Sequence, residues 1–278
     1  MERSFEYWHY PRPIQQFFAD RRQGAKTIGQ TARTFRDQHV ASGRPARNAD
    51  WIATQSGLPW LPLSVEFPAS AMLEEARRLR SHFVSHRGEE GRPEYLGKGW
   101  RALTLHGLSA TQSRDAHNYG QRLRGKRRKV PAGVTDPYAR AESEASYHWT
   151  EASKRCPVTT AWLKKTLPHG IYFRVRFMVL EPGAFLLPHI DRHFPALSEM
   201  YASLNQPKGA YLKVKDFGYV PQRTGRLTML DVGKVHSVIN ASEEDRYNLV
   251  IIGVHNHNTR WRSMLEESYT KFMNGRLS

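Results

Sequence analysis

Cysteine is nearly absent from this chain of 278 residues, where Cys156 is the only one. One thiol cannot form an intramolecular disulfide, and it excludes zinc or iron–sulfur sites built from several thiolates. Long apolar runs are missing too: hydrophobic residues make up 39% of the chain and the mean hydropathy is -0.65. No stretch of about 18 apolar residues is present, and the start, MERSFEYWHY, lacks the basic and apolar pattern of a secretory leader. We therefore expect a soluble, cytoplasmic protein with no membrane partner.

Acidic residues are scarce, with 26 Asp and Glu against 42 Lys and Arg, so the formal net charge is +16. Such a surface attracts anions. Residues 1–50 are rich in Arg, Gln, Ala and Gly and are expected to form a basic N-terminal arm. Six of the eight residues in Arg122–Lys129 are basic. These two segments are either solvated or contact a nucleic acid or an acidic protein.

Residues 51–278 are expected to form a single domain whose first part supports it with helices. Ala69–Val84 and residues 158–167 have helical spacing, and Trp100–Gly107 reads as a strand. After Gly170 the chain is strand-like almost to its end. Strands are expected at residues 171–179, 184–190, 210–214, 226–230, 235–239 and 247–254, with a turn at Pro182-Gly183. This pattern predicts a mainly β fold with flanking helices, a sandwich or barrel of the jelly-roll kind.

Two of these strands carry residues with metal-ligand chemistry. His189 and Asp191 are two residues apart, so on a strand their side chains share one face. His236, on a later strand, adds a third ligand. Two His and one carboxylate with open positions are typical of non-haem Fe(II) oxygenases, in which the open positions take a bidentate co-substrate and O₂. A zinc hydrolase that also uses His193 is the weaker alternative.

Three arginines are candidate anion-binding residues. Arg246 begins the apolar run YNLVIIGV, and a buried guanidinium needs an anion, which a carboxylate satisfies in bidentate fashion. Arg174 and Arg176 alternate with the apolar residues of their strand. They are expected to project either into the barrel mouth, where they bind a substrate carboxylate or phosphate, or into solvent. His193 is expected at the edge of the same pocket.

Two longer runs resemble a known family. RFMVLEPGAFLLPHID and LDVGKVHSVINASEEDRYNLVIIG are similar to the aspartyl/asparaginyl β-hydroxylases, which are Fe(II)/2-oxoglutarate-dependent dioxygenases. The resemblance covers roughly residues 99–260. It implies a double-stranded β-helix core, the jelly-roll fold that cupins share.

The resemblance also implies a role for each motif residue. By position, His189, Asp191 and His236 are the iron ligands, and Arg246 binds the distal carboxylate of 2-oxoglutarate. O₂ is the second co-substrate. Because an anionic ligand is present at Asp191, where a halogenase would bind chloride, the resemblance favours hydroxylation.

One part of the family pattern is missing. Members that act on epidermal growth factor-like domains carry an Arg and a His shortly after the first ligand, whereas residues 196–205 contain neither. The second contact to 2-oxoglutarate is therefore assigned to Tyr201 or Asn205. Those members also lack the carboxylate ligand, which this chain has in Asp191.

The sequence thus predicts a dioxygenase that hydroxylates an unactivated C–H bond of an amino acid or a peptidyl side chain. One alternative is a 2-oxoglutarate oxygenase that acts on nucleic acid or is tethered to it, which the net charge and Arg122–Lys129 suggest. Another is a basic nucleic-acid-binding module whose barrel has no catalytic function.

Overall fold

The computed structural model describes residues 10–19, 59–85, 98–114, 147–167, 171–191, 197–254, 259–274 and 276–277. His193, the Arg122–Lys129 cluster and most of the predicted arm lie outside these described residues. No helix in the described part of the chain is long and apolar enough to cross a membrane.

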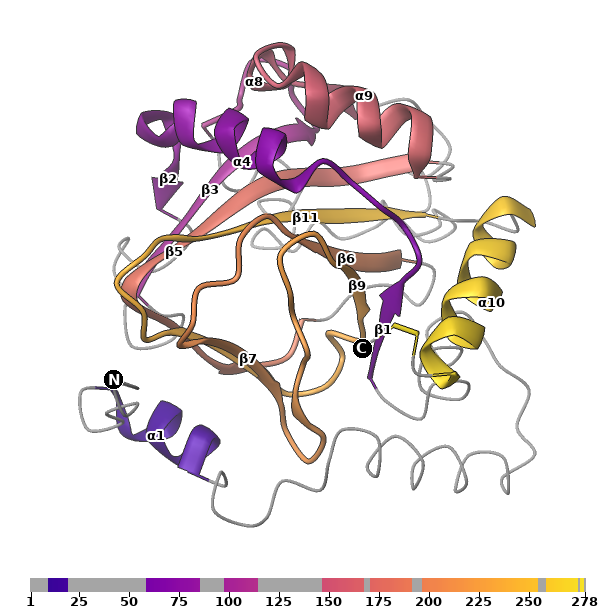
Figure 1. The fold of residues 1–278 in the computed structure, drawn as a ribbon. Coiled ribbons are helices and arrows are strands. Elements are labelled where there is room, and N and C mark those ends of the chain that lie inside the picture. The colour runs from indigo at the N-terminus through magenta and orange to yellow at the C-terminus, as the bar shows by residue number, and fades with distance from the viewer. Residues whose placement is uncertain are drawn as a thin grey trace, which may run out of the picture.

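Antiparallel strands dominate the described residues and join into one curled sheet of eleven strands (Figure 1). In chain order they are β1 (Trp60–Leu63), β2 (Val84–Ser85), β3 (Lys98–Gly107), β4 (His148–Trp149), β5 (Ile171–His189), β6 (Leu197–Ser203), β7 (Ala210–Val214), β8 (Gly218–Tyr219), β9 (Leu227–Leu230), β10 (His236–Asn240) and β11 (Arg246–Val254). The main path runs β1-β9-β6-β11-β5-β10-β7-β8, and β3 pairs with β2, β4 and β5.

The long strand β5 connects the two layers of the barrel. Its first half, from Ile171 to Leu180, pairs with β11, and together with β6, β9 and β1 these strands form the first layer. Its last residues pair with β10, which continues into β7 and β8 as the second layer. The partners change around Gly183, whose φ of 71° suits glycine. The sequence predicted a turn between two strands here, but one continuous strand passes through. This arrangement is a double-stranded β-helix, which confirms the predicted jelly-roll fold.

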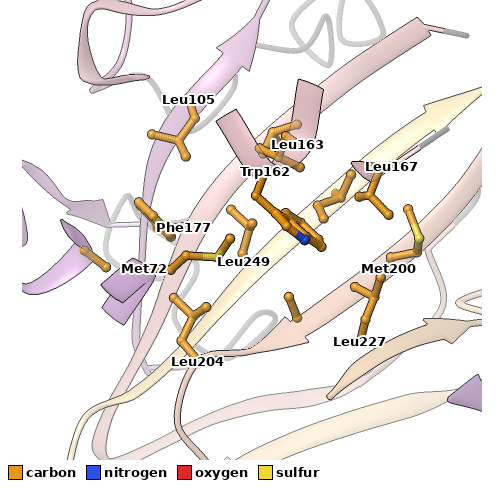
Figure 2. Close-up of a cluster of buried hydrophobic side chains, with 14 of the residues drawn as sticks. Met72, Leu105, Trp162, Leu163, Leu167, Phe177, Met200, Leu204, Leu227 and Leu249 are labelled. Carbon is orange, nitrogen blue, oxygen red and sulfur yellow. The ribbon is translucent and has the colours of Figure 1, made fainter. Parts of the chain in front are cut away.

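Helices cover the outer face of the first layer. Three of these helices are α4 (Ala69–Arg78), α8 (Glu151–Lys154) and α9 (Pro157–Thr166). Figure 2 shows Trp162 and Leu163 of α9 among strand residues that include Phe177 and Leu249. Since side chains alternate along β5, the neighbours of Phe177 on either side point into the barrel instead.

Among the elements of this layer that the sequence did not predict are a helix and a strand. The chain ends in a helix, α10 (Thr259–Met273), which packs beside β1, so the expectation of strands almost to the end was wrong (Figure 1). Its apolar stripe is narrow, because Trp261 and Leu265 lie among polar residues. Strand β1 contains Pro62, which breaks the sequence pattern of a strand. Proline is tolerated there because β1 is an edge strand, whose one partner among the described strands is β9.

Another unpredicted strand, β6, contains Tyr201, which was predicted only as a co-substrate contact. It pairs with both β11 and β9, so it lies inside the sheet.

A helix from the predicted arm belongs to the folded core. In α1 (Arg12–Ala19), Ile14 and Phe18 are fully buried against Ile239 and Tyr219 on the outer face of the second layer. The Lys213 ammonium donates a hydrogen bond to the Phe17 carbonyl and lies over its ring. At least this part of residues 1–50 is therefore structural.

The start of α9 is fixed by a buried carboxylate from α4. Glu75, 2% exposed, accepts hydrogen bonds from the backbone N–H groups of Val158 and Thr159 at 2.8 and 3.0 Å, and from the Thr159 hydroxyl at 2.7 Å. These amides have no partner within their own helix, and the positive end of the helix dipole favours the negative charge. Glu75 thereby links the two helices.

We expect Glu75→Ala to lower the free energy of unfolding by roughly 2–3 kcal/mol, because it leaves buried donors unsatisfied. Urea denaturation measures the change. The matched control is Glu74→Ala, which removes an exposed carboxylate paired with Arg77 and should cost no more than about 0.5 kcal/mol. Equal losses in the two variants would contradict the role of Glu75.

Candidate metal centre

Three predicted ligands converge at the end of β5. His189, its last residue, lies directly opposite His236, the first residue of β10. Asp191 follows two residues later, and its N–H donates a 3.0 Å hydrogen bond to the carbonyl of Val232, in the segment that leads into β10. The Asp191 Oδ2 atom is 3.8 Å from His189 Nε2 and 3.9 Å from His236 Nε2.

Backbone carbonyls orient both imidazoles. The Nδ1 atom of His189 is 2.7 Å from the Leu187 carbonyl, and Nδ1 of His236 is 2.9 Å from the Lys234 carbonyl. A carbonyl only accepts, so Nδ1 carries the proton and Nε2 keeps its lone pair. Both lone pairs are therefore available on the side where Asp191 lies.

This donor set fits a divalent transition metal. The three ligand atoms lie within 4.8 Å of one another, and the separations between nitrogen and carboxylate oxygen are too long for hydrogen bonds. Burial lowers the pKa of His236, which favours the neutral form that binds metals. Two imidazoles and one carboxylate on one side of an ion leave its other side open.

The triad lines a cavity between the two layers of the barrel. The cavity has about 560 Å³ of empty space, a figure that includes the open solvent at its mouth. Its wall combines the metal-site residues with apolar and cationic side chains: Trp100, Arg176, Met178, Val179, Leu180, Leu186, His189, Asp191, Tyr201, Leu212, His236, Val238, Arg246, Asn248 and Val250. An elongated ligand at the metal therefore meets both apolar surface and a cation.

Arg246 supplies one cation of this wall. It is 3% exposed, it lies opposite Leu180 on β5, and burial lowers its pKa to about 10, so the guanidinium is charged at neutral pH. Its Nε donates to Gln206 Oε1 at 3.2 Å, and its Nη2 donates to Gln222 Oε1. No carboxylate among the described residues forms an ion pair with it. The site thus holds a buried positive charge.

Comparison with known protein families identifies the family of this chain. The model of the aspartyl/asparaginyl β-hydroxylase family matches residues 69–256. The chain belongs to this family. It is therefore an oxygenase, a hydroxylase of the Fe(II)/2-oxoglutarate type, as the resemblance implied.

Solved structures give a further comparison. The chain is similar to a prolyl-4-hydroxylase from Pseudomonas putida, at 15% identity over 75% of this chain and 97% of that chain, with a TM-score of 0.40. It is also similar to AviO1 from Streptomyces viridochromogenes Tue57, at 12% identity over 76% and 96% of the two chains, with a TM-score of 0.38. No protein of the curated set matches.

The other two candidate arginines of this oxygenase are buried. Arg174 and Arg176 are 5% and 3% exposed, so the alternative of solvent-exposed side chains was wrong. Arg176 lies on the cavity wall, with its guanidinium carbon 5.5 Å from the centre of the Trp100 ring. The second cation is thus placed in the same cavity as the metal ligands.

The two candidates for a second co-substrate contact lie in different places. Tyr201 lines the cavity and donates a 2.5 Å hydrogen bond to Glu199, and burial raises the pKa of its phenol. Asn205 is not in the wall. Its amide bonds the backbone before and within β11, donating to the Asp245 carbonyl at 2.8 Å and accepting from the Tyr247 N–H at 2.7 Å.

Sequence reasoning missed four residues that belong to this environment. Asn248 is two residues after Arg246 on one strand, so alternation alone would have placed it on the same wall. Trp100 was predicted only as the start of a strand, and it borders the cavity. Gln206 and Gln222 come from loops, where no periodic signal marks them.

We expect His236→Ala to weaken binding of Co(II), used as a redox-stable substitute for Fe(II), by at least about a hundredfold, because one of three ligands is lost. Calorimetric titration of the metal-free protein measures this. The control is His82→Ala, since His82 is half-buried and contacts Arg155 away from the triad. Unchanged affinity in His236→Ala would refute the metal site.

Proposed function

We propose that this oxygenase hydroxylates an unactivated C–H bond of an amino acid or a peptidyl side chain, with Fe(II), 2-oxoglutarate and O₂. One observation carries the proposal: the triad of His189, Asp191 and His236 and the buried cation Arg246 border one cavity. A metal-bound dianion of moderate length is the ligand that such a pair of features fits.

The triad would hold iron through both His Nε2 atoms and one carboxylate oxygen. Bound iron supplies the oxidative chemistry, in which O₂ converts 2-oxoglutarate to succinate and CO₂ and one oxygen atom enters the substrate C–H bond. The protein orients the reactants. His189 and His236 are fixed by backbone carbonyls, so their ligand atoms need little reorganisation.

Arg246 would bind the distal carboxylate of 2-oxoglutarate. It lies opposite Leu180, near the point where β5 changes partners, whereas the triad lies at the far end of that strand. The co-substrate would lie between them along an apolar wall that includes Leu186 and Val238. This wall excludes water and strengthens the charge–carboxylate interaction.

Arg176 would bind an anionic group of the substrate, a carboxylate on the amino-acid reading. It is two inward-facing positions from Leu180 on β5, toward the start of the strand, and Trp100 packs against its guanidinium. Arg174 is the next inward-facing residue and would assist. His193 stays a prediction at the pocket edge.

We expect the protein with Fe(II) and 2-oxoglutarate to release succinate, and Asp191→Asn to lower that rate by at least about a hundredfold, because a neutral amide replaces the anionic ligand. Succinate is measured by mass spectrometry. Asp216→Asn makes the same chemical change at an exposed turn with φ of 66° and should leave the rate unaltered. Full activity in Asp191→Asn would exclude the proposed chemistry.

We expect a screen of free amino acids and short peptides to yield a product heavier by one oxygen atom. With that substrate, Arg176→Met should raise its KM by roughly 10- to 100-fold, through loss of a charge-assisted hydrogen bond, and leave the KM for 2-oxoglutarate unchanged. The control is Arg101→Met, on the opposite face of β3 from Trp100, where Arg101 pairs with Glu181. A change confined to the 2-oxoglutarate KM would reassign Arg176 to the co-substrate.

A further inference from the structure

Within the described part of the chain, the charge of Arg246 is hydrogen-bonded to neutral oxygens only. Its two hydrogen bonds go to the side-chain carbonyls of Gln206 and Gln222, and no described carboxylate pairs with it. Burying a cation without an anionic partner is costly, and proteins ordinarily avoid it. The arrangement therefore suits a residue whose anionic partner is a ligand.

The nearest acidic residue in the sequence is turned away. Asp245 precedes Arg246, and its Oδ2 accepts hydrogen bonds from Arg80 Nε at 3.0 Å and from the Tyr247 hydroxyl at 3.2 Å. Because side chains alternate along β11, Asp245 and Tyr247 lie on the face opposite Arg246. Arg80 thus pairs with the carboxylate that is nearest to Arg246 in the sequence.

Gln206 is held so that its oxygen faces Arg246. Its Nε2 donates a 2.7 Å hydrogen bond to the Ala210 carbonyl, which only accepts, and this settles which end of the amide is the oxygen. Its backbone N–H donates to Thr224 Oγ1 at 3.0 Å, in the loop that also carries Gln222. The two loops that supply the acceptors are thereby tied together.

The two glutamines bond one edge of the guanidinium. Nε and Nη2 point along the same side of the planar group, so the bonds to Gln206 and Gln222 fix its orientation. The Nη1 donors and the second Nη2 donor are not used in these two bonds. They form the end of the fork that binds a carboxylate in bidentate fashion.

We infer that Gln206 and Gln222 are positioning residues that hold Arg246 through neutral oxygens, so that its full positive charge is reserved for the distal carboxylate of the co-substrate. The inference rests on the proposed function. A glutamate at either position would keep the hydrogen bond but supply an internal counter-ion. The incoming carboxylate would then compete with that anion and be repelled by it.

The test is Gln222→Glu, which changes charge and hardly changes shape. We expect the KM for 2-oxoglutarate to rise at least about tenfold while kcat changes by less than about threefold, because only co-substrate binding is affected. The thermal midpoint should stay the same or rise, since the new carboxylate pairs with Arg246. Gln206→Glu should raise this KM as well, but it should lower the thermal midpoint, because a carboxylate cannot donate to the Ala210 carbonyl. Gln222→Asn keeps a neutral acceptor on a shorter side chain. Its KM for 2-oxoglutarate should therefore lie between those of the wild-type protein and Gln222→Glu.

The matched control is Gln16→Glu on the exposed side of α1, which adds the same charge and should leave both constants unchanged. An unchanged KM in Gln222→Glu would overturn the inference. So would a lowered thermal midpoint with equal losses in kcat and kcat/KM, which indicates a merely structural role. If the wild-type protein itself fails to bind 2-oxoglutarate, measured by calorimetry with Co(II) present, the proposed function fails instead.

Discussion

The alternation of side chains along β5 and β11 is the constraint on which the site depends. One face of β5 packs against the helices and contains Phe177 and its apolar neighbours, which supply much of the burial that stabilises the domain. The other face is thereby free to carry Arg176, and Arg246 occupies the corresponding face of β11. The inner face thus carries charged residues among apolar ones. This is possible because the larger hydrophobic core lies between the helices and the outer face of the strands.

The register between β5 and β10 then determines which metal-ligand side chains lie together. His189 and His236 are opposite one another in the ladder between β5 and β10, so a one-residue slip would send one imidazole to the outer face. The backbone contributes a second time, since carbonyls two residues before each histidine select the tautomer with a free Nε2. Metal-ligand geometry therefore follows from strand pairing and local backbone, with little need for side-chain support.

The sequence allowed most of the longer strands and the candidate metal ligands to be proposed, because the strands and the pair His189 and Asp191 show short-range periodicity. The spacing of His189 and Asp191 shows a shared face directly. The sequence could not show which face of the first strand packs against helices, because both faces of β5 are inaccessible to solvent. It therefore left two possible positions for Arg174 and Arg176. Gln206 and Gln222 could not be found at all. They reach Arg246 from separate loops, and only tertiary packing brings them there.

Formal charges in the barrel argue for the chemistry of the substrate. In the proposed complex, the two positive charges of Fe(II) and the one of Arg246 balance the carboxylate of Asp191 and the two carboxylates of 2-oxoglutarate. That half of the cavity is neutral. The other half of the cavity wall carries Arg176, a cation that is 3% exposed. A carboxylate stabilises a buried guanidinium in bidentate fashion, as is proposed for Arg246 and 2-oxoglutarate. The proposal of an anionic group on the substrate extends the same physical argument to this part of the cavity.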